Sequence, residues 1–127
     1  MPPVRAAKAT ALAVCALSAL AATAGCGQAQ RVGRSRLVQV ALTEYRLSPA
    51  ALRVRRGPLT LVVHDFGRLA HNLAVLRGAT TVAETPPIQP GSGVTLAVWL
   101  APGTYTLAST LLDDEALGMH GKLAVTR

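Results

Sequence analysis

Hydrophobic and polar residues alternate with a period of two along much of the chain after residue 36. The alternating or continuously apolar runs are short, and they lie at 38–42, 52–54, 59–63, 73–76, 94–100, 105–107 and 123–125. Such runs are typical of β-strands, and Pro-Gly pairs at 90–91 and 102–103 supply turns between them. The pattern predicts an all-β domain of about seven strands, folded as a two-sheet sandwich or as a barrel.

The longest stretch without alternation runs from Ser109 to Gly121. It holds three consecutive acidic residues at 113–115, followed by Met119 and His120. Its leucines and alanines are spaced to support one helical turn. Candidate chemistry is therefore concentrated in one connection near the end of the chain.

Residues 1–25 have the features of an export signal, with Arg5 and Lys8 before an apolar run at 9–22. Small residues follow, and two cleavage sites are compatible with them. Cleavage before Gly25 would release a secreted soluble protein. Residues 23–26 are instead similar to a bacterial lipobox, which would leave an acylated Cys26 as the new N-terminus. We expect an exported protein, lipid-anchored on the extracytoplasmic side of the cell membrane.

The expected organisation is therefore a signal peptide at 1–25, a tether at 26–36 and one domain at 37–127. The only cysteines of the chain are Cys15, inside the signal, and Cys26. The folded domain consequently contains no thiolate and no disulfide.

The formal net charge is +7, and +5 remains once Arg5 and Lys8 are removed with the signal. A lipid anchor would place this positive charge beside anionic head groups. Nucleic acid is an unsuitable partner, because the chain has only four aromatic residues and none is interleaved with the arginines. The dense group Arg53, Arg55 and Arg56 is interpreted as a solvated strand edge.

Four landmarks resemble the cupredoxins, the plastocyanin and azurin type. They are a strand leading into Asp65-x-Gly67 and then His71-Asn72, Pro90-Gly91, residues 102–105 (Pro-Gly-Thr-Tyr), and Gly118-Met119-x-Gly121. Their order and spacing agree with that family from about residue 36 to the end. The resemblance implies an antiparallel Greek-key β-sandwich of the cupredoxin type, with about seven to eight strands.

The resemblance also implies a ligand set, in which a His, a Cys, a second His and a Met hold copper. His71 and Met119 are kept here, whereas Ser109 occupies the Cys position and Asp114 the second His position. A serine hydroxyl is far too weakly acidic to replace a thiolate at neutral pH. In the family, the Asn that follows the first ligand His connects that loop to the residue after the ligand Cys. The corresponding residues here are Asn72 and Thr110.

Two functions remain open. The first is copper handling, in which a non-blue site binds Cu(I) or colourless Cu(II) through His71 and Met119. Asp114 and His120 would be additional ligands, and the partner would be a copper donor or acceptor. The second is a metal-free interaction module, in which Met119 fills the apolar loop end and that end or the arginine edge docks a membrane partner. No nucleophile elbow, phosphate loop or zinc-protease motif is present, so an enzyme is not expected.

Overall fold

The computed structural model describes residue 3 and residues 28–127. Cys26, and all of the predicted signal peptide except Pro3, lie outside the described residues. Among the residues described, no helix is long and apolar enough to span a membrane.

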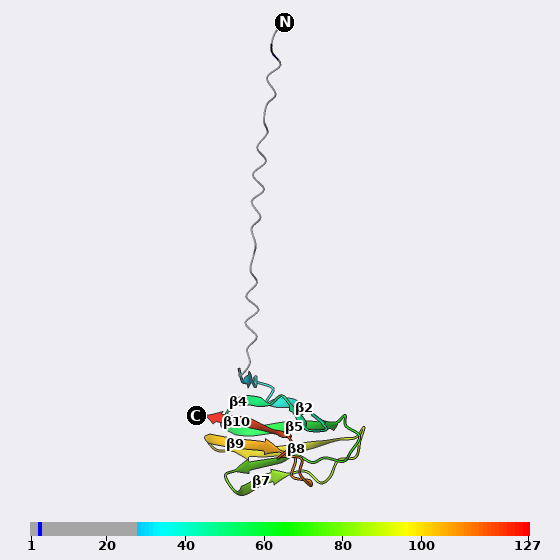
Figure 1. Ribbon diagram of the computed structural model, residues 1–127. Coiled ribbons are helices and arrows are strands. Elements are labelled where there is room, and N and C mark those ends of the chain that lie inside the picture. The colour runs from blue at the N-terminus through cyan, green and yellow to red at the C-terminus, as the bar shows by residue number, and fades with distance from the viewer. Residues whose placement is uncertain (1–2, 4–27) are drawn as a thin grey trace.

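Within residues 28–127, ten strands form two packed sheets (Figure 1). Their bounds are β1 (Gln30–Arg31), β2 (Leu37–Thr43), β3 (Arg46–Ser48), β4 (Ala51–Arg55), β5 (Gly57–Asp65), β6 (Ala74–Arg77), β7 (Thr80–Glu84), β8 (Gly93–Leu100), β9 (Gly103–Ala108) and β10 (His120–Thr126). One sheet has the order β1-β4-β10-β9-β6-β7, and the other has the order β3-β2-β5-β8. The predicted all-β sandwich is confirmed, with β1, β3 and β7 in addition to the expected strands.

Both sheets are mixed, so the prediction of an antiparallel sandwich is wrong in this respect. β2 pairs with β5 in parallel, and β4 pairs in parallel with both β1 and β10. The chain crosses from one sheet to the other between β3 and β4 and again between β4 and β5. Strands that are neighbours in a sheet are therefore often separated in sequence, and β5 returns to its sheet in the same direction as β2.

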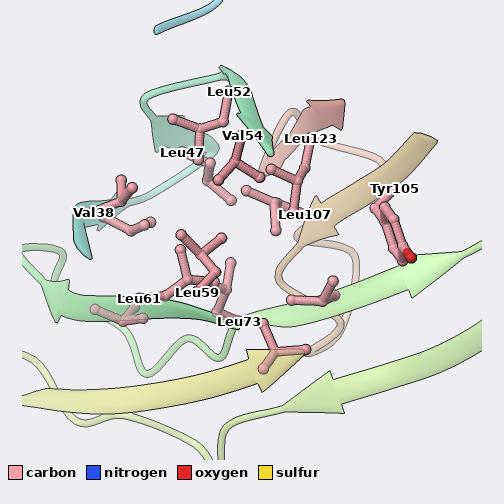
Figure 2. Packing of buried hydrophobic residues seen from close by; sticks show 14 of the residues in the cluster. Val38, Leu47, Leu52, Val54, Leu59, Leu61, Leu73, Tyr105, Leu107 and Leu123 are labelled. Carbon is pink, nitrogen blue, oxygen red and sulfur yellow. The ribbon is translucent and has the colours of Figure 1, made fainter. Parts of the chain in front are cut away.

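The alternation read from the sequence becomes the core of the sandwich. In β2, Val38, Val40 and Leu42 are buried, and in β10 Leu123 and Val125 are buried. Figure 2 shows such side chains from both sheets pointing into the space between them. Burying one face of each strand stabilises the fold by about 25 cal/mol per Å² of apolar surface, an upper estimate.

β1 lies inside the segment 26–36 that the sequence assigns to a tether. Gln30 and Arg31 pair with Leu52 and Arg53, and the Val32 amide donates to the Arg53 carbonyl at 2.9 Å. The described part of this segment therefore runs along the edge strand β4.

The long strand β5 defines the two ends of the sandwich. It runs from Gly57 at one end to Asp65 at the other, eight steps that span about 26 Å. The turn 44–45, the segment 66–73 and the segment 109–119 gather at the Asp65 end, which we call the loop end. The loop end contains the candidate site.

Candidate metal centre

The segment after β5 is shaped by its own first residue. Asp65 Oδ1 accepts the Gly67 amide at 2.8 Å, a local turn that short acidic side chains favour. Farther along, His71 exchanges two backbone hydrogen bonds with Ile88, at 3.2 and 2.7 Å. The His71 backbone is thereby fixed, and its side chain is fully buried.

Asn72 joins this segment to the one after β9. Its Oδ1 accepts the Thr110 amide at 2.7 Å, its Nδ2 donates to Thr110 Oγ1 at 3.0 Å, and its backbone amide donates to Ser109 Oγ at 3.3 Å. Since Asn72 is buried, these bonds replace the water that its amide would otherwise bind. The structure thus places Asn72 against Thr110. It also brings Ser109 close to His71, which directly precedes Asn72.

The His71 imidazole lies between two carboxylates. Its Nδ1 is 2.7 Å from Asp114 Oδ2, and its Nε2 is 3.3 Å from Glu44 Oε1. The same Asp114 oxygen also accepts the Ser109 hydroxyl at 2.7 Å. Asp114 is itself nearly buried, so this carboxylate is held by the two side chains that contact it.

Burial and charge act on His71 in opposite directions. Desolvation lowers the pKa of His71, but hydrogen bonds to Asp114 and Glu44, and the negative charge of Asp114 and Asp65, raise it above the ordinary 6.5. The net direction is upward. The site therefore favours a protonated imidazole that donates from both nitrogens, one to each carboxylate.

Glu44, in the turn between β2 and β3, is the residue of this site that the sequence did not reveal. Its Oε1 accepts the backbone amides of Leu69, at 2.8 Å, and of Arg68. The Leu69 amide lowers the pKa of Glu44 most, desolvation opposes it, and the Arg68 amide and His71 lower it further, to about 2 from 4.5. Glu44 stays ionised and supports both the 66–73 segment and the imidazole.

Met119 and His120 are adjacent in sequence, but the first is buried and the second is exposed. Met119 is fully buried, its carbonyl accepts the Ser109 amide at 3.0 Å, and its amide donates to the Asp114 carbonyl at 2.9 Å. His120 is exposed at the start of β10 and lines an outer hollow with Asp113 and Glu115. Alternation along β10 explains this, because the next residue, Gly121, faces inward. The structure does not bring His120 to His71.

The four positions that hold copper in the resemblance, His71, Ser109, Asp114 and Met119, are thus brought together at the loop end. They do not fit a blue copper site, because a hydroxyl that donates to Asp114 stands where a thiolate is needed. Over residue 3 and residues 28–127, no group of three or more His, Cys, Asp or Glu side chains is arranged to hold a metal ion. At His71, Asp114 contacts Nδ1 and Glu44 contacts Nε2, so the two carboxylates cannot both join the imidazole on one metal ion.

One buried polar atom near this site has no hydrogen-bond partner, Asp65 Oδ2. Its carboxylate lies close enough to raise the pKa of His71. The loop end therefore concentrates three carboxylates, those of Glu44, Asp65 and Asp114, around one imidazole.

No protein-family model matches the chain. Iron uptake system component EfeO of Yersinia pestis is 29% identical over 89 residues, which are 70% of this chain and 23% of that protein. The chain thus spans about a quarter of the length of the curated relative that it matches.

Solved structures show the fold. Dithionite-reduced auracyanin of Roseiflexus castenholzii superposes with a TM-score of 0.69 at 21% identity, covering 75% of this chain and all of that one. An azurin of Methylomonas sp. strain J gives a TM-score of 0.64 at 14% identity, with 72% and 98% covered. Neighbours of this kind are cupredoxins, and the strand arrangement is shared across almost their whole length. The chain has the cupredoxin fold.

Proposed function

We propose that the protein is an exported, lipid-anchored cupredoxin-like module that binds copper in a non-blue site and acts in copper handling. The observation that carries the proposal is the contact of 2.7 Å between His71 Nδ1 and Asp114 Oδ2, together with the buried Met119, whose amide donates to the Asp114 carbonyl. The proposal includes no catalytic role, and the Ser109 hydroxyl donates to Asp114 instead of to the His71 imidazole.

The donors are an imidazole nitrogen, a carboxylate oxygen and a thioether sulfur, contributed by His71, Asp114 and Met119. Imidazole suits copper in both oxidation states, and a thioether favours Cu(I) over hard cations. The proton that His71 and Asp114 share must leave when a metal binds, so copper affinity increases with pH. His120 takes no part in this proposal because it lies on the outer face.

The relative's name, a component of an iron uptake system, supports metal handling as the general role. For this chain the buried thioether of Met119 argues for copper over iron, because ferric iron is a hard cation. Iron is therefore the control metal in the experiment below.

The cellular setting rests on the residues before Gln28. We propose cleavage after residue 25 and acylation of Cys26, which precedes the first residue of β1, Gln30, by four residues. Intact-mass measurement of protein extracted from membranes tests this: a mass with an acylated Cys26 supports the anchor. A mass that begins at Gly25 contradicts it.

The test of copper binding is a competition titration against a chelator, with the chain 26–127 carrying Cys26→Ser. All ten strands lie within this chain. We expect Cu(I) and Cu(II) to bind and Fe(III) not to bind. The His71→Ala and Met119→Ala variants should each bind at least 10-fold more weakly, and the matched control His120→Ala should bind as the parent does. Equal affinity for parent and His71→Ala, or preference for iron, would contradict the proposal.

A metal-free interaction module is the second candidate, and one observation favours it. Both nitrogens of His71 already have carboxylate partners, so the hydrogen bonding of the imidazole is complete without a metal. In that case the network only stabilises the loops, and the loop end or the edge of Arg53, Arg55 and Arg56 docks a membrane protein. The same titration would then show no copper binding by the folded parent chain.

A further inference from the structure

Charged side chains are segregated along the length of the sandwich. All six acidic residues of the chain lie at or beside the loop end: Glu44, Asp65, Glu84, Asp113, Asp114 and Glu115. Six exposed arginines occupy the opposite end and the edge next to it: Arg31, Arg34, Arg53, Arg55, Arg56 and Arg127. We call this second group the arginine end, and it contains no acidic residue.

Strand register places several of these arginines side by side. Arg31 is the register partner of Arg53, and Arg53 and Arg55 are both exposed on the outward face of β4. The Arg56 amide donates to the Thr126 carbonyl at 2.7 Å, which brings Arg127 to the same corner. Figure 1 shows β4 next to β10 and the C-terminus there.

This clustering is unfavourable without an anionic partner. Like charges on directly paired strand positions destabilise a sheet. Within the part of the chain that the structure describes, the only ion pairs are those of His71 with Glu44 and Asp114. Arg36 and Arg77, which also lie at this end, donate instead to backbone carbonyls and to Tyr105. The six arginines thus present unneutralised charge to an external anion.

The chain reaches the predicted anchor from this same surface. Gln28 lines a hollow of about 400 Å³ together with Arg31 and Arg53. Cys26 precedes Gln28 by two residues, and two residues of extended chain span about 7 Å. An acyl group on Cys26 would therefore insert into lipid close to Arg31 and Arg53.

An aromatic side chain suited to a membrane interface lies at this end too. Trp99, the only tryptophan, is 63% exposed and is the register partner of Pro58, two residues after Arg56. Tryptophan is enriched where a polar head-group region meets hydrocarbon, because one part of its ring is apolar and the other donates a hydrogen bond.

We propose that the arginine end docks on a membrane surface of anionic phospholipid, so that the loop end with His71 faces away from the membrane. The separation of about 26 Å along β5 then keeps the His71 site accessible to a partner on the aqueous side. The docking complements the proposed lipid anchor but does not require it. The experiment uses chains without an acyl group, so the two can fail separately.

The test is co-sedimentation of the chain 26–127, with Cys26→Ser, with vesicles of phosphatidylglycerol and phosphatidylcholine. We expect binding at low salt, loss of binding at high salt, and no binding to phosphatidylcholine alone. The Arg53→Gln/Arg55→Gln variant should bind roughly 10- to 30-fold more weakly. The control Arg46→Gln/Arg68→Gln removes the same charge from exposed residues at the loop end and should bind as the parent does. Equal weakening of the two variants would overturn the proposal.

Three further measurements separate the sources of phosphate and report the orientation. Inorganic phosphate should release the protein from the vesicles only at concentrations at which salt also releases it. Release at a much lower phosphate concentration would indicate a site for a single phosphate and would overturn surface docking. Binding to duplex DNA as tight as binding to the vesicles would overturn lipid as the partner. Trp99 emission should shift to the blue with anionic vesicles only, and an unchanged spectrum on bound vesicles would overturn the proposed orientation.

Discussion

Asp114 connects three residues of the loop end, His71, Ser109 and Met119. One of its oxygens accepts from both His71 and Ser109, and its backbone carbonyl accepts the Met119 amide. The Asp114→Asn variant should lose roughly 3 kcal/mol of unfolding free energy, because it breaks a buried ion pair and leaves its partners unmatched. Urea denaturation measures this. The exposed neighbour provides the control, and Asp113→Asn should unfold at the parent midpoint; equal midpoints for all three proteins would refute the role of Asp114.

The shifted pKa values of His71 and Glu44 predict how stability varies with pH. The raised pKa of His71 contributes stability that is complete below 6.5 and is lost as the pH rises through that raised value. The lowered pKa of Glu44 contributes stability that is present above 4.5 and is lost as the pH falls toward 2. Urea midpoints should therefore be highest between pH 4.5 and 6.5 and should decline above it.

The control for this pH dependence is His71→Gln, which removes the group that titrates on the alkaline side. Its midpoints should show no decline between pH 6.5 and 8 that is attributable to an imidazole. A parent protein that becomes steadily more stable over that interval would contradict the assigned direction of the His71 pKa.

The sequence predicted His71, Ser109, Asp114 and Met119 as site positions because the turns and strands around them have the order and spacing of the cupredoxin landmarks. It gave no sign of Glu44, which is one acidic residue in a tight turn and reaches His71 only through the packing of distant segments. It also left His120 as a candidate. Only the inward position of Gly121, and hence the outward direction of His120, removes it from the site.

At the scale of elements, the 109–119 segment is held against the turn between β2 and β3 by close backbone approach. Gly118 has φ of +122°, and a Cβ there would lie 2.7 Å from the Tyr45 carbonyl oxygen. Gly118→Ala should therefore destabilise the protein by about 1 to 3 kcal/mol. Gly33→Ala is the matched control, since nothing lies within 4 Å of its Cβ position, and it should be nearly neutral in thermal unfolding. Similar losses in both variants would contradict this account.

Strands with one buried face were predictable, and exposed edge strands were not. β2, β4 and β10 alternate between buried and exposed residues, so their sequences carry the signal. β1 has no buried residue, β7 is exposed except at Ala83, and β3 has only three residues. The parallel pairs were also missed, because alternation reports which face is buried but not the direction of the neighbouring strand.

At the scale of the whole molecule, copper binding should raise thermal stability. A ligand that binds only the native state stabilises it by about 2.7 kcal/mol at 100 times its Kd. For a domain of this size the Tm should rise on the order of 10 °C with Cu(I) or Cu(II). Differential scanning calorimetry measures the shift. The His71→Ala/Met119→Ala variant should show none, and an unshifted parent would favour the metal-free alternative.

The most direct test of the account is the visible spectrum of the Cu(II)-loaded chain beside that of its Ser109→Cys variant. If the loop end keeps the geometry of a copper site and lacks only the thiolate, the parent should be colourless. The variant should then gain an intense thiolate-to-copper absorption that disappears when His71→Ala is added. A coloured parent, or a folded Ser109→Cys variant that binds copper without gaining colour, would contradict the claim that these positions still converge on one metal.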